Sequence, residues 1–135
     1  MDCLFCKIVE KKMAAQVIYE DDNYLVFLDI NPTTKGHSLV VPKKHADNFT
    51  EFNNKEAMGL AGVVHRVAPQ IVQAIGADGY NLGLNNGVAA GQIIDHVHWH
   101  IIPRYENDKL RLWDRSEYES EILDQTFDTL KGKIN

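Results

Sequence analysis

The sequence predicts an α+β fold with an antiparallel five-stranded sheet, and three features support this prediction. Short stretches rich in β-branched and aromatic residues lie on both sides of one long stretch with helical periodicity. The resulting order of strands, helix, strands and helix is typical of α+β proteins rather than of a doubly wound parallel sheet. The chain has 135 residues and contains no linker, repeat or low-complexity tract, which fits a single domain.

The elements follow one another in a clear order. In chain order, we expect a short N-terminal turn or helix over 5–10, strands over 16–20, 24–28 and 37–41, a long helix over 54–75, strands over 80–85 and 95–102, and a C-terminal helix from Ser116. The turn Asp21-Asp22-Asn23 joins the first two strands into a hairpin, and Pro42 ends the third strand.

The long helix is predicted from apolar residues at three- and four-residue steps: Leu60, Val63, Val64, Val67, Ile71 and Ile75. Pro69 lies inside this pattern and is expected to bend or split the helix. Gly76 is a suitable C-cap. Ser116 and Glu119 have the spacing of a capping box at the start of the last helix.

The segment His96-Val97-His98-Trp99-His100-Ile101-Ile102 is the most informative part of the chain. In a strand its three histidines point to one face, about 6.6 Å apart, while Val97, Trp99 and Ile101 point into the core. Imidazole nitrogens need partners, so a row of them suits phosphate or metal chemistry better than a core. Three interpretations are open: a three-histidine metal site, a nucleophilic histidine with supporting groups, or a strand without function. Ligands that converge within about 2.1 Å of zinc do not fan out along a line, which favours the second interpretation.

Composition excludes several classes of partner. The net charge is −5, so no basic field would gather nucleic acid. No apolar stretch approaches the roughly 20 residues that span a membrane, and Met1-Asp2-Cys3 does not resemble a secretion signal. We therefore expect a cytoplasmic protein. In that reducing compartment, Cys3 and Cys6 are half of a metal site, a redox pair or two buried thiols rather than a disulfide.

The histidine segment resembles the histidine triad (HIT) nucleotide-binding family, in which His alternates with apolar residues. Further segments stand in the family's order: Asp29-Ile30-Asn31-Pro32, 36–45, Asn85-Asn86-Gly87 and Ala90-Gly91-Gln92. The resemblance covers residues 4–104, which implies a single HIT domain over 1–135 with its core at about 4–104 and a C-terminal extension at about 105–135. It also implies the HIT-like fold, with one long helix, a short N-terminal helix and a C-terminal helix.

The resemblance implies covalent catalysis by His98. Its imidazole would attack the α-phosphorus of a nucleotide and form a nucleotidyl-histidine, from which water releases the nucleoside monophosphate. His100 would donate to phosphate oxygens, and His37 would support it from behind. The ring of His98 would be held in one tautomer by a backbone carbonyl.

The nucleotide-binding residues are also implied by the resemblance. Asp29 would accept hydrogen bonds from the ribose hydroxyls, and Asn85 and Gln92 would hold the phosphate or the loop around it. Four apolar residues would enclose a purine: Phe5, Ile8, Phe27 and Ile30. Ile93 stands where many members carry a Ser or Thr that contacts the leaving group, so the chain departs from the family there.

A structural zinc site is implied as well. Cys3 and Cys6 have ligand spacing, and His45 and His96 would complete a Cys₂His₂ site as in the bacterial type of HIT protein. His96 would then serve the metal rather than the phosphate. The alternative is a metal-free protein with His96 hydrogen-bonded inside.

These residues predict a purine nucleotide hydrolase or nucleotidyl transferase that cleaves nucleoside phosphoramidates or adenylated amines. The alternatives are a diadenosine polyphosphate hydrolase, a nucleotide-binding regulatory module with weak catalysis, and a hydrolase that uses the three histidines on zinc. The family also implies a homodimer, with contacts from Tyr80–Leu84 and from the helix face of Leu60, Val64 and Val67.

Overall fold

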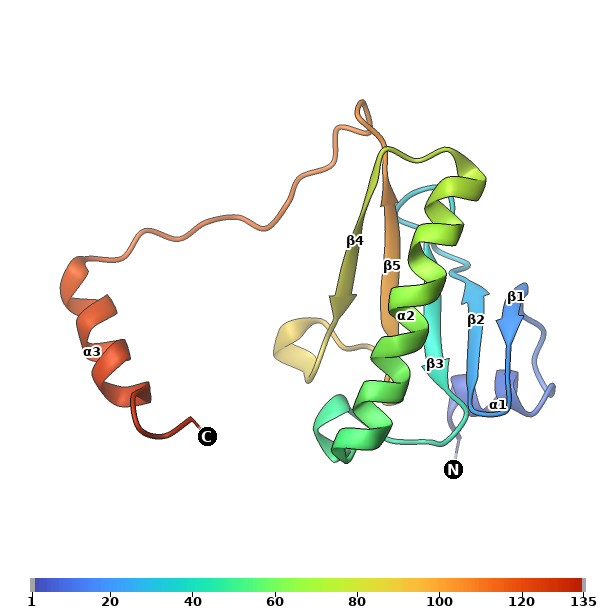
Figure 1. Cartoon of the computed structure of the whole chain (residues 1–135), viewed down its shortest axis with the longest axis horizontal. Helices are drawn as coiled ribbons and strands as arrows, with labels where there is room; N and C mark the ends of the chain where they lie inside the picture. Colours follow the sequence, from blue (N-terminus) through green and yellow to red (C-terminus); the bar gives the residue numbers. More distant parts are fainter. Residues whose placement is uncertain (1, 135) are drawn as a thin grey trace.

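The structure, a computed structural model that describes residues 2–134, confirms the predicted α+β fold. Five antiparallel strands form one open sheet in the order β1-β2-β3-β5-β4, and α2 lies across it (Figure 1). The elements are α1 (Leu4–Val9), β1 (Val17–Glu20), β2 (Tyr24–Leu28), β3 (Ser38–Pro42), α2 (Asn54–Ile75), β4 (Gly79–Leu84), β5 (Trp99–Arg104) and α3 (Ser120–Leu130), with single 3-10 turns at Phe49–Glu51 and Val88–Ala90.

The two faces of the sheet pack against different elements. Val26 and Val40 face α2 and belong to a core with Leu60, Val64 and Ile101. Their neighbours along the strands point to the other face and form a second cluster with α1, made of Cys3, Phe5, Leu25, Phe27, Leu39 and Val41. Burial on both faces explains why β2 and β3 read as almost continuous apolar runs. The N-terminal cysteines are thereby held against the sheet.

Helix α2 runs unbroken through Pro69, so of the two outcomes expected there, a bend or a split, the split is wrong. Asn53 and Glu56 form a capping box at its start, and Gly76 ends it in the left-handed conformation, as predicted, with φ 68°. Pro69 lies on the exposed side of the helix. The carbonyl of His65, which loses its helical partner there, therefore remains open to water, and packing of the opposite side keeps the helix continuous.

The predicted dimer contact from α2 is also wrong. Leu60, Val64 and Val67 are buried in the core between α2 and the sheet, so this face is not available to a second copy. The apolar periodicity of these residues reflects their packing in the core of the same chain. In contrast, Tyr80 and Leu82 of β4 are exposed, and β4 is an edge strand of the sheet.

The histidine strand begins later than the sequence predicts, at Trp99 instead of residue 95. β5 pairs with β3 only from Trp99, opposite Val40, onwards. Pro42 has no N–H for a ladder bond, and its carbonyl accepts a hydrogen bond from the ring of His96 instead. His96 and His98 therefore lie in the irregular segment before the strand, although Val97 and Ile101 are buried in the core as expected.

The C-terminal segment leaves the sheet at the end of β5 and runs outward on the side of β4. Helix α3 therefore lies apart from the rest of the chain (Figure 1). Helix α3 begins at Ser120, with Glu119 as N-cap and no side-chain capping bond, so the predicted start at Ser116 is wrong. A capping box contributes only about 1 kcal/mol, which is too little to fix an extra turn without packing. The division into a core at 4–104 and an extension at 105–135 stays a prediction.

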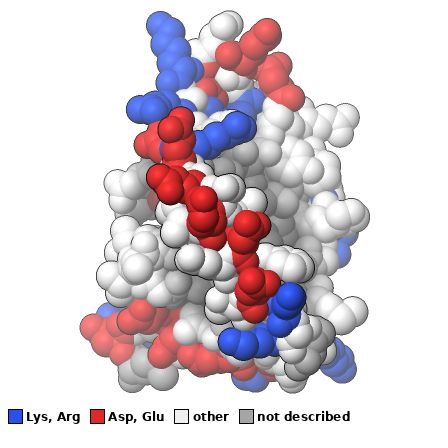
Figure 2. All heavy atoms as spheres, turned by 90° about the vertical axis from the view of Figure 1, so that its left-hand side faces the viewer, with Lys and Arg blue, Asp and Glu red and all other residues white. Residues whose placement is uncertain are grey.

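The surface on the side of α3 carries a band of acidic side chains among mostly uncharged ones, with Lys and Arg near its ends (Figure 2). Helix α3 itself carries Glu121, Asp124 and Asp128. Among residues 2–134, no helix combines the length and the apolar character that crossing a bilayer requires.

Candidate active site and metal centre

The four residues predicted to bind a metal lie close together beside α1. Cys3 and Cys6 come from the start of the chain, His45 from the loop after β3, and His96 from the segment before β5. Their ligand atoms all lie within 4.8 Å of one another. Cys3 acts as the N-cap of α1, which orients both thiols toward the same point.

The distances within this cluster fit a tetrahedral zinc ion. The Nδ1 atoms of His45 and His96 are 3.2 Å apart, and the Sγ of Cys3 is 3.4 Å from Nδ1 of His96. The Sγ of Cys6 is 3.3 Å from Nδ1 of His45. With ordinary zinc bond lengths, a tetrahedron separates two nitrogens by about 3.4 Å and a sulfur from a nitrogen by about 3.5 Å. The donor set and its spacing are therefore consistent with zinc.

The proton positions in the two rings support a cation at this point. Nε2 of His96 lies 2.8 Å from the carbonyl of Pro42, and Nε2 of His45 lies 2.8 Å from the carboxylate of Asp47. Both partners can only accept, so each neutral ring carries its proton on Nε2. Two bare lone pairs on Nδ1 then face each other, an arrangement that a cation between them, or a proton from the Cys3 or Cys6 thiol, would stabilise. Burial, with Cys3 nearby, raises the pKa of Cys6 to about 11, so metal binding must release a proton.

His98 is held in the tautomer that a nucleophile requires. Its Nδ1 donates to the backbone carbonyl of His96 over 2.7 Å, which leaves the lone pair on Nε2. Only 7% of the residue is exposed, and the edge of Phe5 packs against the ring. The ring of His100 stands next to it, with centroids 5.0 Å apart. The backbone carbonyl that orients His98 thus belongs to His96, which is also one of the four candidate metal ligands.

His37 and His100 form a second ordered chain of hydrogen bonds. The backbone N–H of Thr33 donates to Nδ1 of His37 over 3.0 Å, so neutral His37 carries its proton on Nε2. That nitrogen lies 2.9 Å from Nδ1 of His100 and donates to it. His100 therefore carries its own proton on Nε2, where it can be donated to a ligand. The supporting role predicted for His37 has a structural counterpart in this chain.

Burial keeps these rings neutral. It lowers the pKa of His100 to about 4, and the neighbouring His98 and His37 add to the effect. Burial also lowers the pKa of His37, partly offset by Asp29, and that of His98. An unprotonated imidazole is the form that attacks phosphorus.

The residues predicted to bind a purine nucleoside are only partly brought together. Phe5 and Phe27 pack edge to face at 5.5 Å, and Ile8 packs against the same cluster. Ile30 instead points to solvent and is 87% exposed. Asp29 caps its loop by accepting from the N–H of Asn31. Its second carboxylate oxygen lies 3.6 Å from His37 Nε2, which places Asp29 at the edge of the histidine cluster.

Asn85 and Gln92 have different surroundings. Asn85 is half-buried beside His100 in the cavity described below. Gln92 is buried, and its amide is engaged on both sides: the N–H of Gly87 donates to Oε1, and Nε2 donates to the carbonyl of Ile94. Gln92 therefore braces the loop that precedes His96. The prediction that it contacts phosphate stays a prediction.

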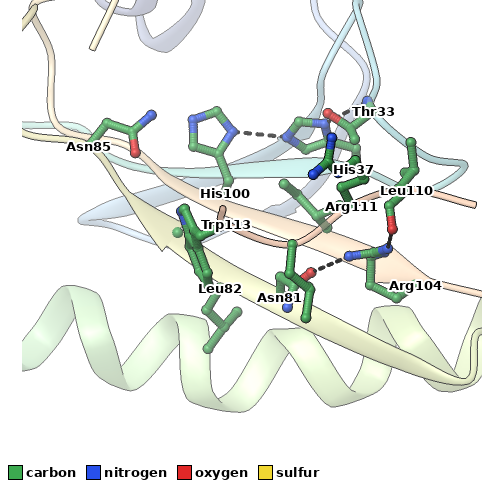
Figure 3. A pocket seen from close by; sticks show the side chains of 13 residues that line it. Thr33, His37, Asn81, Leu82, Asn85, His100, Arg104, Leu110, Arg111 and Trp113 are labelled. Atoms are coloured by element: carbon green, nitrogen blue, oxygen red, sulfur yellow. Dashed lines mark hydrogen bonds between the residues drawn. The ribbon is translucent and has the colours of Figure 1, made fainter. Parts of the chain in front are cut away.

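A cavity of ≈ 460 Å³ opens beside His37 and His100 (Figure 3). Its floor is formed by Asn81, Gly83 and Ile102 of β4 and β5, and Thr33 lies at its rim. The other wall comes from the segment after β5: Leu110, Arg111, Leu112 and Trp113. Sequence reasoning missed this wall because these residues follow no periodic pattern and match none of the motifs. Arg104, which directly follows Pro103, was the one residue that could have drawn attention to this cavity.

Comparison with known proteins identifies the family. The model of the HIT domain matches residues 10–107. The chain belongs to the HIT domain family. An uncharacterized HIT-like protein of Methanocaldococcus jannaschii is 45% identical over 96% of this chain and 99% of its own length.

Two relatives have named activities. Adenylylsulfatase HINT3 of Arabidopsis thaliana is 45% identical over 81% of this chain and 55% of its own length. Adenosine 5′-monophosphoramidase hnt1 of Schizosaccharomyces pombe is 43% identical over 77% of this chain and 75% of its own. These HIT relatives support a hydrolase in general.

Solved structures agree with the fold. SMU.412c from Streptococcus mutans is 37% identical with a TM-score of 0.90, and the match covers 99% of this chain and 86% of that one. A Zn-bound histidine triad family protein from Mycobacterium smegmatis is 37% identical with a TM-score of 0.78, over 99% of both chains. The predicted HIT-like fold is confirmed.

Proposed function

We propose that this HIT protein is a purine nucleotide hydrolase or nucleotidyl transferase that cleaves nucleoside phosphoramidates or adenylated amines at the α-phosphate through a nucleotidyl-His98 intermediate. The hydrogen bond from His98 Nδ1 to the carbonyl of His96 carries this proposal. It fixes the lone pair on Nε2 at a ring that burial keeps neutral. The named activities of the plant and yeast relatives support the reaction class.

In the first step, Nε2 of His98 forms a bond to the α-phosphorus while the bond from phosphorus to the leaving group breaks and its electron pair goes to that group, which takes a proton from water when it departs as an amine. His100 Nε2–H donates to a phosphoryl oxygen, and the chain from Thr33 through His37 keeps that proton in place. In the second step, water attacks phosphorus, the nitrogen–phosphorus bond breaks with its electron pair returning to Nε2 of His98, the proton of the attacking water passes to solvent, and the nucleoside monophosphate leaves. An acceptor other than water makes the same reaction a transfer.

The nucleoside would lie toward α1 and β2. Phe5, Ile8 and Phe27 supply apolar surface for a purine, and Ile30 at the entrance would cover it on binding. Asp29 supplies a carboxylate oxygen for the ribose diol beside His37. Asn85 would hold the phosphate from the side of β4.

The Cys₂His₂ cluster is proposed to hold a structural zinc ion. All four ligands come from the protein, which leaves no position for substrate. When bound, the ion would join the N-terminus to the segment that carries His96, two residues before the nucleophile. Two neighbouring cysteines that form no disulfide fit the reducing cytoplasm that we propose as the location.

A direct test is to trap the intermediate. The protein is mixed with adenosine 5′-phosphoramidate, quenched within milliseconds and analysed by peptide mass spectrometry. We expect an adenylyl group on His98, and we expect His98→Ala to lose turnover by about 10⁴-fold or more while still binding AMP. His65→Ala is the matched control, because His65 is exposed on α2. Adenylylation of another residue, or unchanged turnover in His98→Ala, contradicts the proposal.

Diadenosine polyphosphate hydrolysis is a second candidate. The cavity of ≈ 460 Å³ beside His100 has room for more than ammonia, and the aromatic ring of Trp113 lines it. Release of ATP from diadenosine tetraphosphate at a rate comparable with phosphoramidate cleavage would favour this candidate.

We also propose a homodimer formed through the edge of β4. Tyr80 and Leu82 are exposed on this open edge, and the segment that leads to α3 extends past it (Figure 1). Helix α3 exposes Leu123 and Phe127 without packing on its own sheet. The match with the S. mutans crystal structure covers 99% of this chain, so it includes the segment that leads to α3.

The mass in solution tests this dimer. Sedimentation of the whole chain is expected to give twice the monomer mass, and Leu82→Lys is expected to shift it toward the monomer. A monomer at micromolar concentration contradicts the proposal.

A further inference from the structure

The two cysteines at the start of the chain are placed so that they can form a disulfide with each other. Cys3 is the N-cap of α1, and Cys6 lies three residues further on, in the first turn of the helix. The backbone N–H of Cys6 donates to the Sγ of Cys3 over 3.4 Å, and the two Sγ atoms lie within 4.8 Å of each other. Helical geometry separates Cα atoms at this spacing by about 5 Å, within the roughly 4.4–6.8 Å that a disulfide spans. A bond between the two sulfurs is therefore compatible with the backbone of α1.

The two thiols differ in their access to solvent. Cys3 is only 8% exposed and packs in the cluster with Phe5 and Leu39, whereas Cys6 is half-buried at the edge of that cluster. The sequence contains no other cysteine. A soluble oxidant therefore meets Cys6 first, and the thiol within reach of an oxidised Cys6 is that of Cys3.

The cysteine pair contacts the residue that orients the proposed nucleophile. The Sγ atoms of Cys3 and Cys6 lie 3.4 Å and 3.6 Å from Nδ1 of His96. The carbonyl of His96 accepts the hydrogen bond from Nδ1 of His98. A single residue thus separates the thiol pair from His98, so a chemical change at the pair acts on the segment that holds His98 in place.

We propose that Cys3 and Cys6 are a site of reversible oxidation by peroxides, at which a disulfide forms in place of the metal cluster and loosens the segment of His96 and His98. The disulfide follows from the placement of the cysteines, and its effect on activity rests on the proposed function and on the proposed metal site. When bound, a zinc ion keeps both sulfurs in the thiolate form, which is the form that reacts with peroxide.

The oxidation takes two steps. The thiolate of Cys6 attacks one oxygen of hydrogen peroxide, the oxygen–oxygen bond breaks, and Cys6 becomes a sulfenic acid as hydroxide leaves. The thiolate of Cys3 then attacks the sulfur of Cys6, the sulfur–oxygen bond breaks, and a second hydroxide leaves as the disulfide forms. Each hydroxide takes a proton from solvent. Two thiolates are oxidised, and one peroxide is reduced to two waters.

The disulfide removes half of the metal ligands. Metals bind the thiolate form of cysteine, so only the imidazoles of His45 and His96 remain as ligands after oxidation. A structural zinc site takes four protein ligands, and two do not retain the ion against solvent. The connection between the N-terminus and His96 is then lost. A thiol reductant reopens the disulfide by exchange, which restores the four ligands.

The position of the cysteines makes the test direct, because Met1–Lys7 is a single tryptic peptide that contains both of them. The whole chain is loaded with zinc, treated with hydrogen peroxide, alkylated and digested, and the released metal is measured with a chromogenic chelator. We expect the peptide to lose two hydrogen atoms and to take up no alkylating reagent, with one metal ion released per chain. Dithiothreitol should reverse both changes. A peptide that stays open to alkylation, or that is oxidised to sulfinic acid instead, overturns the proposal.

Two variants test the order of the steps. In Cys3→Ser the sulfenic acid on Cys6 has no thiol partner, so we expect dimedone to label Cys6. In Cys6→His the chain keeps four ligand side chains but cannot form the disulfide, and peroxide should release its metal about tenfold more slowly than from the natural sequence. Equal rates of release from both proteins, or no dimedone adduct on Cys6, overturn the proposal. Met58→Leu is the control, because it removes a 73% exposed methionine and should leave the response to peroxide unchanged.

Measurements on the reduced protein separate this inference from the proposed function. Metal content and adenylylation of His98 are determined before peroxide is added, and the absence of either contradicts the proposed function or the proposed zinc site, whatever the cysteines do. We expect the oxidised protein to hydrolyse adenosine 5′-phosphoramidate about tenfold more slowly and to recover with dithiothreitol. A disulfide that forms without any loss of turnover overturns the effect on His98.

Discussion

The metal cluster and the catalytic cluster each bring two imidazole rings together, and they differ in whether a proton lies between the facing nitrogens. In the metal cluster, the proton-free Nδ1 atoms of His45 and His96 face each other at 3.2 Å. In the catalytic cluster, a proton lies between His37 and His100, whose nitrogens are 2.9 Å apart. This difference depends on the group that contacts the ring nitrogen facing away from the pair. When that group is a hydrogen-bond acceptor, the proton lies on the outer nitrogen and the inner nitrogen has none. When it is a donor, as for His37, the proton lies on the inner nitrogen.

The two clusters are joined at a single residue. His96 binds the Pro42 carbonyl with its ring and accepts from His98 Nδ1 with its own carbonyl. The same backbone segment thus orients a proposed metal ligand and the proposed nucleophile. Each prediction below breaks or sharpens the contrast between the two clusters.

Loss of the metal should have the largest effect, and on stability. For the metal-loaded protein, removal of the ion with a strong chelator is expected to lower the free energy of unfolding by about 4 kcal/mol. Thermal melts with and without zinc measure this, and Cys6→Ser should melt like the chelated protein. In Asp47→Asn, which weakens the hydrogen bond to His45 Nε2, metal affinity should fall only about 10–100-fold. A melting temperature that does not change when the metal is removed would contradict a structural role.

Interruption of the catalytic chain should lower turnover with little change in stability. His37→Phe removes the donor to His100 Nδ1, so the proton of His100 is no longer fixed on Nε2. We expect kcat to fall about 100-fold while KM changes little. His37→Gln can still donate from its amide and should recover part of the rate. Full activity of His37→Phe would show that the hydrogen bonds from Thr33 through His37 to His100 play no part in the mechanism.

The dependence of stability and activity on pH below 7 should show that the buried imidazoles have lowered pKa values. The pKa of His100 is lowered to about 4 in the folded protein, against about 6.5 in the unfolded chain. The folded state therefore binds fewer protons below pH 6.5, and the free energy of unfolding is expected to fall by about 2 kcal/mol between pH 7 and pH 5 from this residue. Activity should persist to lower pH than an ordinary imidazole would allow, since burial lowers the pKa of both His37 and His100.

The pH dependence needs a variant that isolates His100 from the metal site, which also takes up protons in acid. In His100→Asn, denaturant unfolding at pH 7 and pH 5 should differ by less than in the natural sequence. The groups around His100 that could titrate with it are His37, His98 and Asp29. An equal loss of stability in both proteins would assign the effect to the metal cluster.

The sequence predicted much of this architecture for identifiable reasons. The alternation of histidines with Val97 and Ile101 fixed which side chains enter the core, even though the strand starts only at Trp99. Three-residue spacing of Cys3 and Cys6, together with the family resemblance, predicted the four residues that the structure brings within 4.8 Å. The helix face of Leu60, Val64 and Val67 was misread as a contact, because periodicity reports burial without naming the partner.

Local pattern by itself determined the order of elements, the buried faces and the residue types that carry the chemistry, because propensity and periodicity act over a few residues. Only the tertiary structure decided which imidazole nitrogen is bare. That choice depends on the carbonyls of Pro42 and His96 and on the N–H of Thr33, backbone groups that every sequence contains. It also decided that Arg111 lines a cavity with His100, since the Arg104–Asp108 pair directs the chain there.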